Sequence, residues 1–315
     1  MYLDLHVITN QIAVLFLLMA LGFVVGKAKI LSENGNKVIS KIVVNIAMPC
    51  LMLSAVFESE AGITFGDTML FILFSFLTLG ITFAVSIPVM RLFGGNKADR
   101  GLLNFMSIFS NSGFMGFPVI IAIFGISAAY YVAMFHIPFN ALIFTVGILM
   151  ISGKKNQSAK QHSKKINPKL LLSPAFIVSL ISIPIALIGI NPPYIVAEAA
   201  RITGSITTPG AMIVIGSTFA YIPLKNIFSE WRIIPMTILR LIIIPILTWL
   251  ILKQIITNDL VLGVLVVISA MPSASMASLL AIEYGGNEKI ATAGVFVTTL
   301  LCGITVPLIV RFLLL

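Results

Sequence analysis

Charge is what this 315-residue sequence lacks most, because only 10% of its residues are Asp, Glu, Lys or Arg while 59% are hydrophobic. A soluble domain carries about 25% charged residues, and the mean hydropathy of +1.09 also excludes a soluble protein. We therefore expect an integral membrane protein. Lys and Arg outnumber Asp and Glu by 20 to 11. These basic residues lie in short gaps between apolar runs, which indicates membrane topology rather than nucleic-acid binding.

Cysteine and histidine are also scarce. Cys50 and Cys302 both lie in apolar runs, so a disulfide framework is not expected. The sequence has no metal-spaced His/Cys cluster, no H-E-x-x-H and no phosphate-binding glycine loop. His136 is the one histidine inside an apolar run. The hypothesis of an intramembrane serine hydrolase therefore depends on this single candidate base. We therefore expect neither an enzyme nor a metal or cofactor site.

Carboxylates are missing from the middle of every apolar run. This absence weighs against a Na⁺ or H⁺ site built on Asp or Glu, although carbonyls and hydroxyls can also bind sodium. Ten runs approach the roughly 20 residues that a helix needs to cross a bilayer. They cover residues 7–27, 41–58, 68–90, 101–125, 128–152, 170–190, 204–223, 232–252, 260–284 and 290–312.

The gaps between these spans alternate in charge. Basic residues such as Lys27 and Arg91 follow the first and third spans, whereas Glu58, Glu60 and Asp67 follow the second without any basic residue. Basic gaps face the cytoplasm in multi-pass proteins. The alternation predicts a multi-pass protein of the cell membrane with both termini outside.

An internal repeat divides the chain into two halves, 1–153 and 170–315, joined by a lysine-rich cytoplasmic linker at 154–169. An offset of about 160 residues places "KIVVNIAMPCLM" over "RITGSITTPGAM", with Pro49 over Pro209. Each half contains five spans, an odd number, so the second half must enter the membrane from the opposite side. Two inverted five-helix repeats are typical of secondary transporters.

Two spans carry helix-breaking residues at a similar depth. "NSGFMGFPVI" begins at Asn111, about 15 Å from the start of the fourth span, and "MPSASM" begins about 17 Å into the ninth span. We expect Pro118 and Pro272 to break these helices, and Gly113 and Gly116 to permit unwound backbone. Irregular backbone at this depth must be buried in protein or line a watery cavity.

If the two breaks meet, the positive amino-terminal ends of the following half-helices converge on one point, which suits an anion such as a carboxylate. A simple kink or packing groove is the alternative for either motif alone. Asn45 and Thr208 precede corresponding prolines in the two halves, where they either touch the substrate or cap a proline break. The candidate substrate-binding residues are Asn111, Ser112, Gly113, Gly116, Pro118, Pro272, Ser273, Ser275, Asn45 and Thr208.

Three further polar residues lie inside predicted spans. His136 and Asn140 share one face of the fifth span. Histidine side chains ordinarily titrate near neutral pH, which makes His136 a candidate for proton coupling, with a hydrogen bond to a neighbouring helix as the alternative. Arg240 is the one charge well inside a span and needs a partner or water. It either binds the anion or holds the helix ends of a neighbouring break.

Four motifs, "NSGFMGFPVIIAIFG", "NIAMPCLML", "LRLIIIPIL" and "MPSASMASLLAIEYG", resemble the auxin efflux carrier family, which contains the PIN carriers of plants and malate-permease-like proteins of bacteria. The resemblance covers nearly the whole chain. It implies an all-α membrane fold of ten helices in two inverted repeats, of the bile-acid symporter/antiporter type. Helices 1, 2, 6 and 7 would form a scaffold, helices 3–5 and 8–10 a transport domain, and broken helices 4 and 9 would cross at the organic-anion site.

The resemblance also implies roles for single residues. Asn111 would be the polar contact beside the crossing, and Pro118 and Pro272 would mark the two breaks. The short linker, and Met276 where plant members carry a second proline, favour an organic-acid carrier of the bacterial type over an auxin carrier.

The sequence therefore predicts a secondary transporter of a small organic anion, such as malate or an auxin-like acid, by elevator-type alternating access. A Na⁺- or H⁺-coupled symporter of the bile-acid-carrier type and a non-transporting sensor or channel remain open. The expected partners are the organic anion and the lipid bilayer, with a homodimer as an open possibility and no nucleic acid. Substrate identity and transport direction are not readable from the sequence.

Overall fold

A computed structural model describes residues 5–58, 64–152, 174–190, 192–222, 230–284 and 286–315. These residues are helical apart from short connections, and their one extended pairing is an isolated bridge between Ser110 and Ser273. The all-α prediction is confirmed for this part of the chain. The predicted linker at 154–169 lies outside the described residues.

Most predicted spans consist of more than one helical element. Those before the linker are α1 (Leu5–Lys27), α2 (Glu33–Ile42), η1 (Val43–Ala47), α3 (Met48–Phe57), α4 (Phe65–Phe93), α5 (Lys97–Ile108), η2 (Ser112–Gly116), α6 (Phe117–Phe124), η3 (Ile126–Ala128), α7 (Ala129–Leu142), η4 (Ile143–Gly147) and α8 (Ile148–Ser152). Those after it are α9 (Pro174–Ile188), α10 (Tyr194–Ser205), α11 (Thr207–Ala220), α12 (Ile233–Ile238), η7 (Leu239–Ile243), α13 (Ile244–Leu252), α14 (Asp259–Ser269), α15 (Met276–Tyr284), α16 (Glu288–Ile309) and η8 (Val310–Leu314).

Within the described ranges, six helical stretches are long and apolar enough to cross a membrane. They are Ile8–Lys27, Glu33–Phe57, Phe65–Phe93, Ile126–Ile151, Ile233–Leu252 and Glu288–Leu314. Three shorter apolar helices, Ser112–Phe124, Pro174–Ile188 and Asp259–Ser269, add to these. The fold is that of a multi-pass membrane protein.

Two span starts differ from the sequence prediction by eight residues or more. The second span begins at Glu33 rather than at residue 41, and Ser32 caps it by accepting a hydrogen bond from the Gly35 amide at 3.1 Å. The seventh begins at Tyr194 rather than at residue 204. The first of these helices opens with a polar turn that its cap stabilises. The second carries the Glu198–Arg201 ion pair, and a search for apolar runs excludes both stretches.

Short π-helical segments interrupt several spans, and three of them directly precede a helix with proline in its first turn. These pairs are η1 with Pro49, η2 with Pro118 and η7 with Pro245. Proline has no amide hydrogen, and its ring clashes with the carbonyl four residues earlier. A wider π turn before the proline relieves that conflict without ending the helix.

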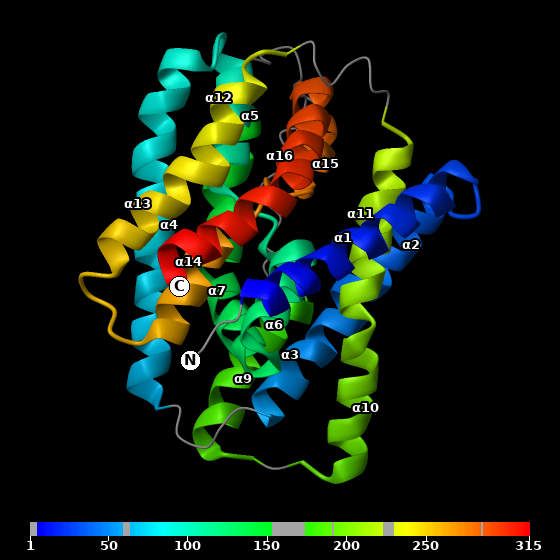
Figure 1. Cartoon of the computed structure of the whole chain (residues 1–315), viewed down its shortest axis with the longest axis vertical. Coiled ribbons are helices and arrows are strands. Elements are labelled where there is room, and N and C mark those ends of the chain that lie inside the picture. The colour runs from blue at the N-terminus through cyan, green and yellow to red at the C-terminus, as the bar shows by residue number, and fades with distance from the viewer. Residues whose placement is uncertain (1–4, 59–63, 153–173, 191, 223–229, 285) are drawn as a thin grey trace.

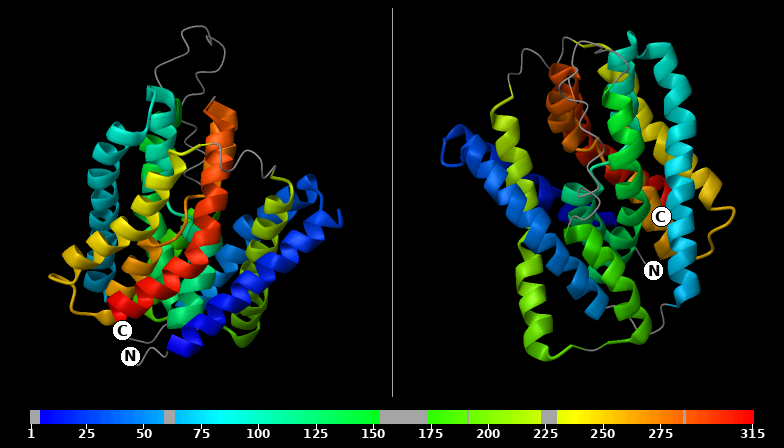
Figure 2. Two further views of the ribbon diagram at one scale, coloured as in Figure 1. Left: turned by 45° about the horizontal axis from the view of Figure 1, so that its top comes forward. Right: turned by 180° about the vertical axis from the view of Figure 1, so that it is seen from behind.

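The helices form two groups that lie side by side in the views of Figures 1 and 2. One group contains α1, α2, α3, α10 and α11, and the other contains α4, α5, α7, α12, α13, α14 and α16, while α9 packs against both α3 and α7. In the first group, α1 and α11 approach so closely that a side chain on Gly216 would collide with the Met19 carbonyl. Such contacts between small residues are typical of membrane helix pairs.

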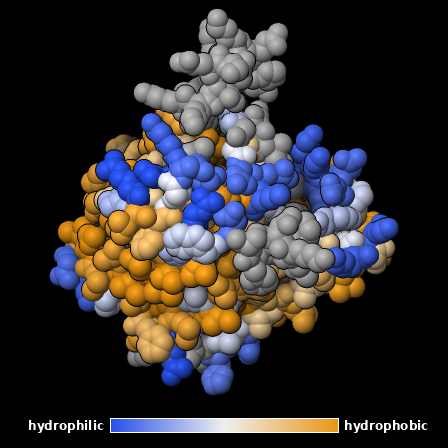
Figure 3. Space-filling model, turned by 90° about the horizontal axis from the view of Figure 1, so that it is seen from above, coloured by the Kyte–Doolittle hydropathy of each residue, from blue (hydrophilic) through white to orange (hydrophobic). Residues whose placement is uncertain are grey.

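The face at which α5, α12 and α16 begin is the polar end of the molecule. Figure 3 shows hydrophilic residues gathered on that face and hydrophobic residues around the sides. Many large apolar side chains are exposed, among them Leu17, Leu73, Ile195 and Phe312. An apolar belt of this kind suits a protein surrounded by lipid.

Candidate functional site

The two predicted breaks are present in the backbone. In the first, α5 ends at Ile108, and helical geometry resumes at Ser112 in η2. In the second, α14 ends at Ser269, and α15 begins at Met276. Each break leaves several backbone groups without a partner in its own helix.

The two breaks satisfy each other through the backbone. The Asn111 amide donates to the Pro272 carbonyl at 2.8 Å, and the Ala274 amide donates to the Phe109 carbonyl at 2.9 Å. This pairing is the isolated antiparallel bridge at Ser110 and Ser273. An unpaired peptide group in a hydrocarbon environment costs several kcal/mol, so pairing makes the two interruptions compatible with a membrane interior.

Side chains reinforce the pairing. Asn111 Nδ2 donates to Ser275 Oγ at 2.9 Å, and Ser273 Oγ donates to the Met106 carbonyl at 2.9 Å. The Ser273 amide in turn donates to Thr298 Oγ1 of α16 at 3.2 Å. The structure therefore brings together four of the candidate residues, Asn111, Pro272, Ser273 and Ser275, around one point. We name the segment pair Phe109–Ser112 and Met271–Met276 the paired breaks.

Arg240 bridges the paired breaks from η7. Its Nε donates to the Met271 carbonyl at 2.9 Å, and its Nη1 donates to the carbonyls of Ser107 at 3.0 Å and Ile108 at 3.3 Å. Nη2 makes a longer contact of 3.5 Å with the Ile268 carbonyl. Two roles are predicted for Arg240, anion binding and the holding of the helix ends at a break. These hydrogen bonds correspond to the second role.

Unpaired amides lie at the start of the helix after the first break. Met115 and Gly116 both donate to the Asn111 carbonyl, at 3.2 and 3.0 Å. The amides of Ser112, Gly113 and Phe114 precede them in the first turn, where helical geometry provides no acceptor. Gly113 and Phe114 are only half-buried. Amides at a helix start bind anions such as carboxylates.

Gly113 leaves room beside these amides. A methyl group on Gly113 would lie 3.6 Å from Met48 Cε of α3 and 3.8 Å from His136 Nε2. Both are ordinary contact distances, so a methyl group fits there without a clash. Gly113 thus lies between the first break, α3 and α7.

His136 contacts the first break directly. Its Nδ1 lies 2.7 Å from the Val132 carbonyl, and its Nε2 lies 3.3 Å from Ser112 Oγ. A carbonyl can only accept, so Nδ1 carries the proton of the neutral ring, and Nε2 accepts from the Ser112 hydroxyl. The ring also stacks on Phe117 at 5.5 Å. Asn140 is half-buried one turn further along α7.

The position predicted for Pro118 is wrong. Pro118 lies in the first turn of α6, after η2, whereas the non-helical backbone comes seven residues earlier around Asn111. The π turn of η2 absorbs the missing amide of Pro118, so the proline does not end the helix. Gly116 is buried in the same π turn, where a methyl group would lie 3.9 Å from Met271 Cγ.

Asn45 and Thr208 do not flank breaks. Asn45 is exposed in η1 and donates to the Lys41 carbonyl of its own helix at 2.9 Å. Thr208 is half-buried in the first turn of α11, which continues through Pro209. The alternative that these residues cap proline breaks is wrong, because helical geometry is kept at both prolines.

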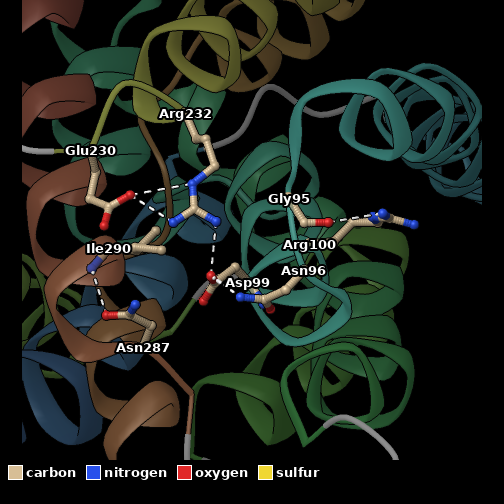
Figure 4. Close-up of polar contacts among 8 residues, drawn as sticks. All are labelled: Gly95, Asn96, Asp99, Arg100, Glu230, Arg232, Asn287 and Ile290. Atoms are coloured by element: carbon tan, nitrogen blue, oxygen red, sulfur yellow. Dashed lines mark hydrogen bonds and ion pairs between the residues drawn. The ribbon is translucent and has the colours of Figure 1, made fainter.

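A second polar constellation was missed in the sequence and lies at the polar end of the molecule (Figure 4). Arg232 donates to Asp99 Oδ2 at 2.8 Å and to Glu230 Oε2 at 2.7 Å, and Asn96 Nδ2 donates to Asp99 Oδ2 at 2.6 Å. We name Asn96, Asp99, Glu230 and Arg232 the Arg232 cluster. The sequence does place charged residues, Asp99 and Arg232, at the starts of two predicted spans. Sequence spacing alone does not show that two residues 133 positions apart form an ion pair.

Comparisons with known proteins agree with a transport function. A family model described as membrane transport protein matches residues 7–310. An uncharacterized transporter of Methanothermobacter thermautotrophicus is 25% identical over 95% of this chain and 96% of its own. The uncharacterized transporter YfdV of Escherichia coli is 23% identical over 93% and 94%. A Rhizobium meliloti protein named as a proposed malonate transporter is 25% identical over 95% and 93%.

Proposed function

Because the chain belongs to the membrane transport protein family, which is the auxin efflux carrier family, we propose that it carries a small organic anion across the membrane by alternating access. The family and its relatives are transporters rather than enzymes. The observation that carries the proposal is the pairing of two interrupted helices, with the Asn111 amide on the Pro272 carbonyl and the Ala274 amide on the Phe109 carbonyl.

The proposed topology has ten spans in two inverted repeats of five. Six helical stretches long enough to cross a membrane support it. The remaining spans would be α9, α10 with α11, and the two interrupted helices α5–α6 and α14–α15. The bridge that joins the fourth and ninth spans at corresponding places also supports the repeat. By the charge alternation of the gaps, both termini lie outside the cell.

In the proposed elevator mechanism, the helix group of α1, α2, α3, α10 and α11 is the scaffold, with α9, and the group that contains the paired breaks moves against it. The site lies where the two groups face each other, since Gly113 approaches Met48 of α3 and η2 packs against α11. Movement of the second group would then expose the site to one side of the membrane at a time.

The proposed ligand is a short-chain carboxylate, in particular a dicarboxylate. The amino-terminal ends of η2 and α15 carry partial positive charge and face the paired breaks. Asn111 and Ser275 supply neutral polar groups beside them. The name of the Rhizobium meliloti relative, a proposed malonate transporter, makes malonate the first ligand to test.

Proton coupling is a second candidate feature, and the contact between His136 and Ser112 favours it. The Nδ1 proton is held by the Val132 carbonyl, so a second proton would enter at Nε2, which faces Ser112 and the break. A charged ring there would offer the anion another donor. A coupled symporter predicts that His136→Gln removes the pH dependence of uptake, and unchanged pH dependence would exclude this role. Sodium coupling would appear as uptake that requires a sodium gradient.

The central experiment is counterflow in proteoliposomes with labelled malonate or malate. A carrier shows saturable exchange, a channel passes the anion without counterflow, and a sensor passes nothing. Asn111→Ala should reduce exchange at least a hundredfold, because it removes the side chain that links the two breaks. Asn45→Ala is the matched control, since the Asn45 amide bonds only to its own helix, and it should exchange at the normal rate. Normal exchange by Asn111→Ala would refute the site.

A further inference from the structure

Arg240 carries a positive charge into the centre of the fold, and no acidic partner for it is found among the residues that the structure describes. We infer that it is a positioning residue that makes the site selective for anions by compensating the negative ends of the two half-helices, without touching the anion itself. This inference rests on the proposed function, because it concerns the same paired breaks. It assigns to Arg240 the charge selectivity of the site rather than a substrate contact.

The surroundings of Arg240 make this an unusual arrangement. Its side chain is among the largest fully buried ones in the described structure, with 1% of the residue exposed. All of the groups that Arg240 contacts are backbone carbonyls, namely those of Ser107 and Ile108 on one side and Ile268 and Met271 on the other. A buried guanidinium is costly unless its donors are satisfied, and these four carbonyls accept from all three of its nitrogens.

The carbonyls belong to the last turns of α5 and α14, or follow directly on them. The last turn of a helix carries a partial negative charge of about half a unit, and the first turn a matching positive one. Two negative ends together amount to about one negative charge, which one guanidinium balances. The positive starts of η2 and α15 are then left as the net field at the site.

The local backbone explains how Arg240 reaches both ends. It lies in the π-helical segment η7, between α12 and α13. A π turn rotates the following side chains relative to a regular helix, and such turns are common at functional sites. Ser273 and Thr298 support the same arrangement from the other side, through the Met106 carbonyl and the Ser273 amide.

Direct anion binding by Arg240 would require the guanidinium to turn away from the Ser107, Ile108 and Met271 carbonyls. The geometry instead directs Nε, Nη1 and Nη2 at the helix ends. A field effect and a purely structural role differ in how they depend on ligand charge. Loss of a field weakens a dianion more than a monoanion, whereas a distorted pocket weakens both alike.

The test measures half-saturation constants in counterflow for malonate and for its monomethyl ester, which carry two charges and one at pH 8. One unit charge at about 10 Å and an effective dielectric constant of about 20 changes the affinity of a monoanion roughly tenfold, and that of a dianion roughly a hundredfold. We expect these two losses in Arg240→Gln. Arg232→Gln, eight residues earlier in the chain, is the matched control and should leave the ratio of the two constants unchanged.

Equal losses for the two ligands, or no loss, in a folded Arg240→Gln variant would overturn the inference. Arg240→Lys keeps the charge with fewer donors, so the ratio should stay within about twofold of the wild-type value even if the maximal rate falls. Should Arg240→Gln not fold, Arg240→Met, which also removes the charge, is measured with the same two ligands: a larger loss for malonate than for its monomethyl ester supports the inference, and equal losses overturn it. Absence of malonate or malate exchange by the unaltered protein would instead count against the proposed function.

Discussion

Arg240 and Arg232 stand eight residues apart on one span, and both tie α5 to the second half of the chain, but their partners differ in kind. Arg232 at the polar end pairs with the carboxylates of Asp99 and Glu230, and its side chain keeps 15% exposure. Arg240 is fully buried and bonds only to carbonyls. Near water the chain uses ion pairs, and at mid-depth it uses the partial charges of helix ends.

This difference has a physical basis. An ion pair near water gains little, because the solvent competes for both charges. In a dry interior a carboxylate would carry its own large desolvation cost, whereas helix-end carbonyls are present in any interrupted helix and need a donor in any case. One arginine then satisfies several orphan acceptors and leaves the positive helix starts free to act on a ligand.

The comparison of Arg240 with Arg232 predicts that Arg240→Met causes the largest loss of stability. Each hydrogen bond to a charged group contributes about 1.5–3 kcal/mol, and an unpaired buried carbonyl costs about as much again. After relief of the guanidinium desolvation, we expect a net loss of about 3 kcal/mol in unfolding free energy. Thermal unfolding in detergent measures it, and a loss below that of Arg232→Met would contradict the comparison.

A large effect on transport with little effect on stability is expected for Gly113→Leu. A methyl group on Gly113 would lie 3.6 Å from Met48 Cε, and the longer leucine side chain would extend into the space proposed for the anion. Malonate exchange should fall at least tenfold while the melting temperature stays within about 3 °C of the unaltered protein. Gly113→Ala is the control and should retain most of its exchange. Full activity of the leucine variant would show that the ligand does not occupy this space.

A smaller effect is expected for Asp99→Asn, which breaks the Arg232 cluster without changing its shape. Ion pairs near the surface contribute about 1 kcal/mol or less, and salt screens them. We expect a loss of about that size in low salt that shrinks as the salt concentration rises. Thermal unfolding at several salt concentrations measures this, with Arg240→Met as the contrast, since its loss should not depend on salt.

The smallest effect is expected for Ser275→Ala, which removes the acceptor of Asn111 Nδ2. A neutral hydrogen bond contributes about 1 kcal/mol, and Ser275 is only half-buried, so water can replace its hydroxyl in part. Stability should change by less than about 1 kcal/mol, while the half-saturation constant for malonate rises several-fold. A change in stability with no change in that constant would place Ser275 outside the site.

The sequence predicts the two breaks because their residues violate the requirements of a membrane helix. Asn111 and Ser273 are polar where the surroundings are apolar, and only a shared partner makes that tolerable. The all-helical fold and the transport family also follow from the sequence, through hydropathy and through the motifs around Asn111 and Pro272. These are features that single residues or short stretches determine.

Other features depend on contacts that no short stretch contains. The break lies at Asn111 rather than at Pro118, because a π turn accommodates the proline. The partners of Arg240 come from helices about 30 and 130 residues away. The helix start at Glu33 depends on the Ser32 cap, and the helix that begins at Tyr194 contains the Glu198–Arg201 ion pair; hydropathy registers neither.

The most direct test of the account is protection of a cysteine placed at Gly113 by the ligand. Cys50 and Cys302 are first replaced by serine, and the Gly113→Cys protein is confirmed to exchange malonate. A negatively charged thiol reagent should then label the new cysteine, and malonate should slow this labelling with the half-saturation constant of exchange. Labelling that malonate leaves unchanged, in protein that still exchanges it, would place the anion elsewhere and contradict the account.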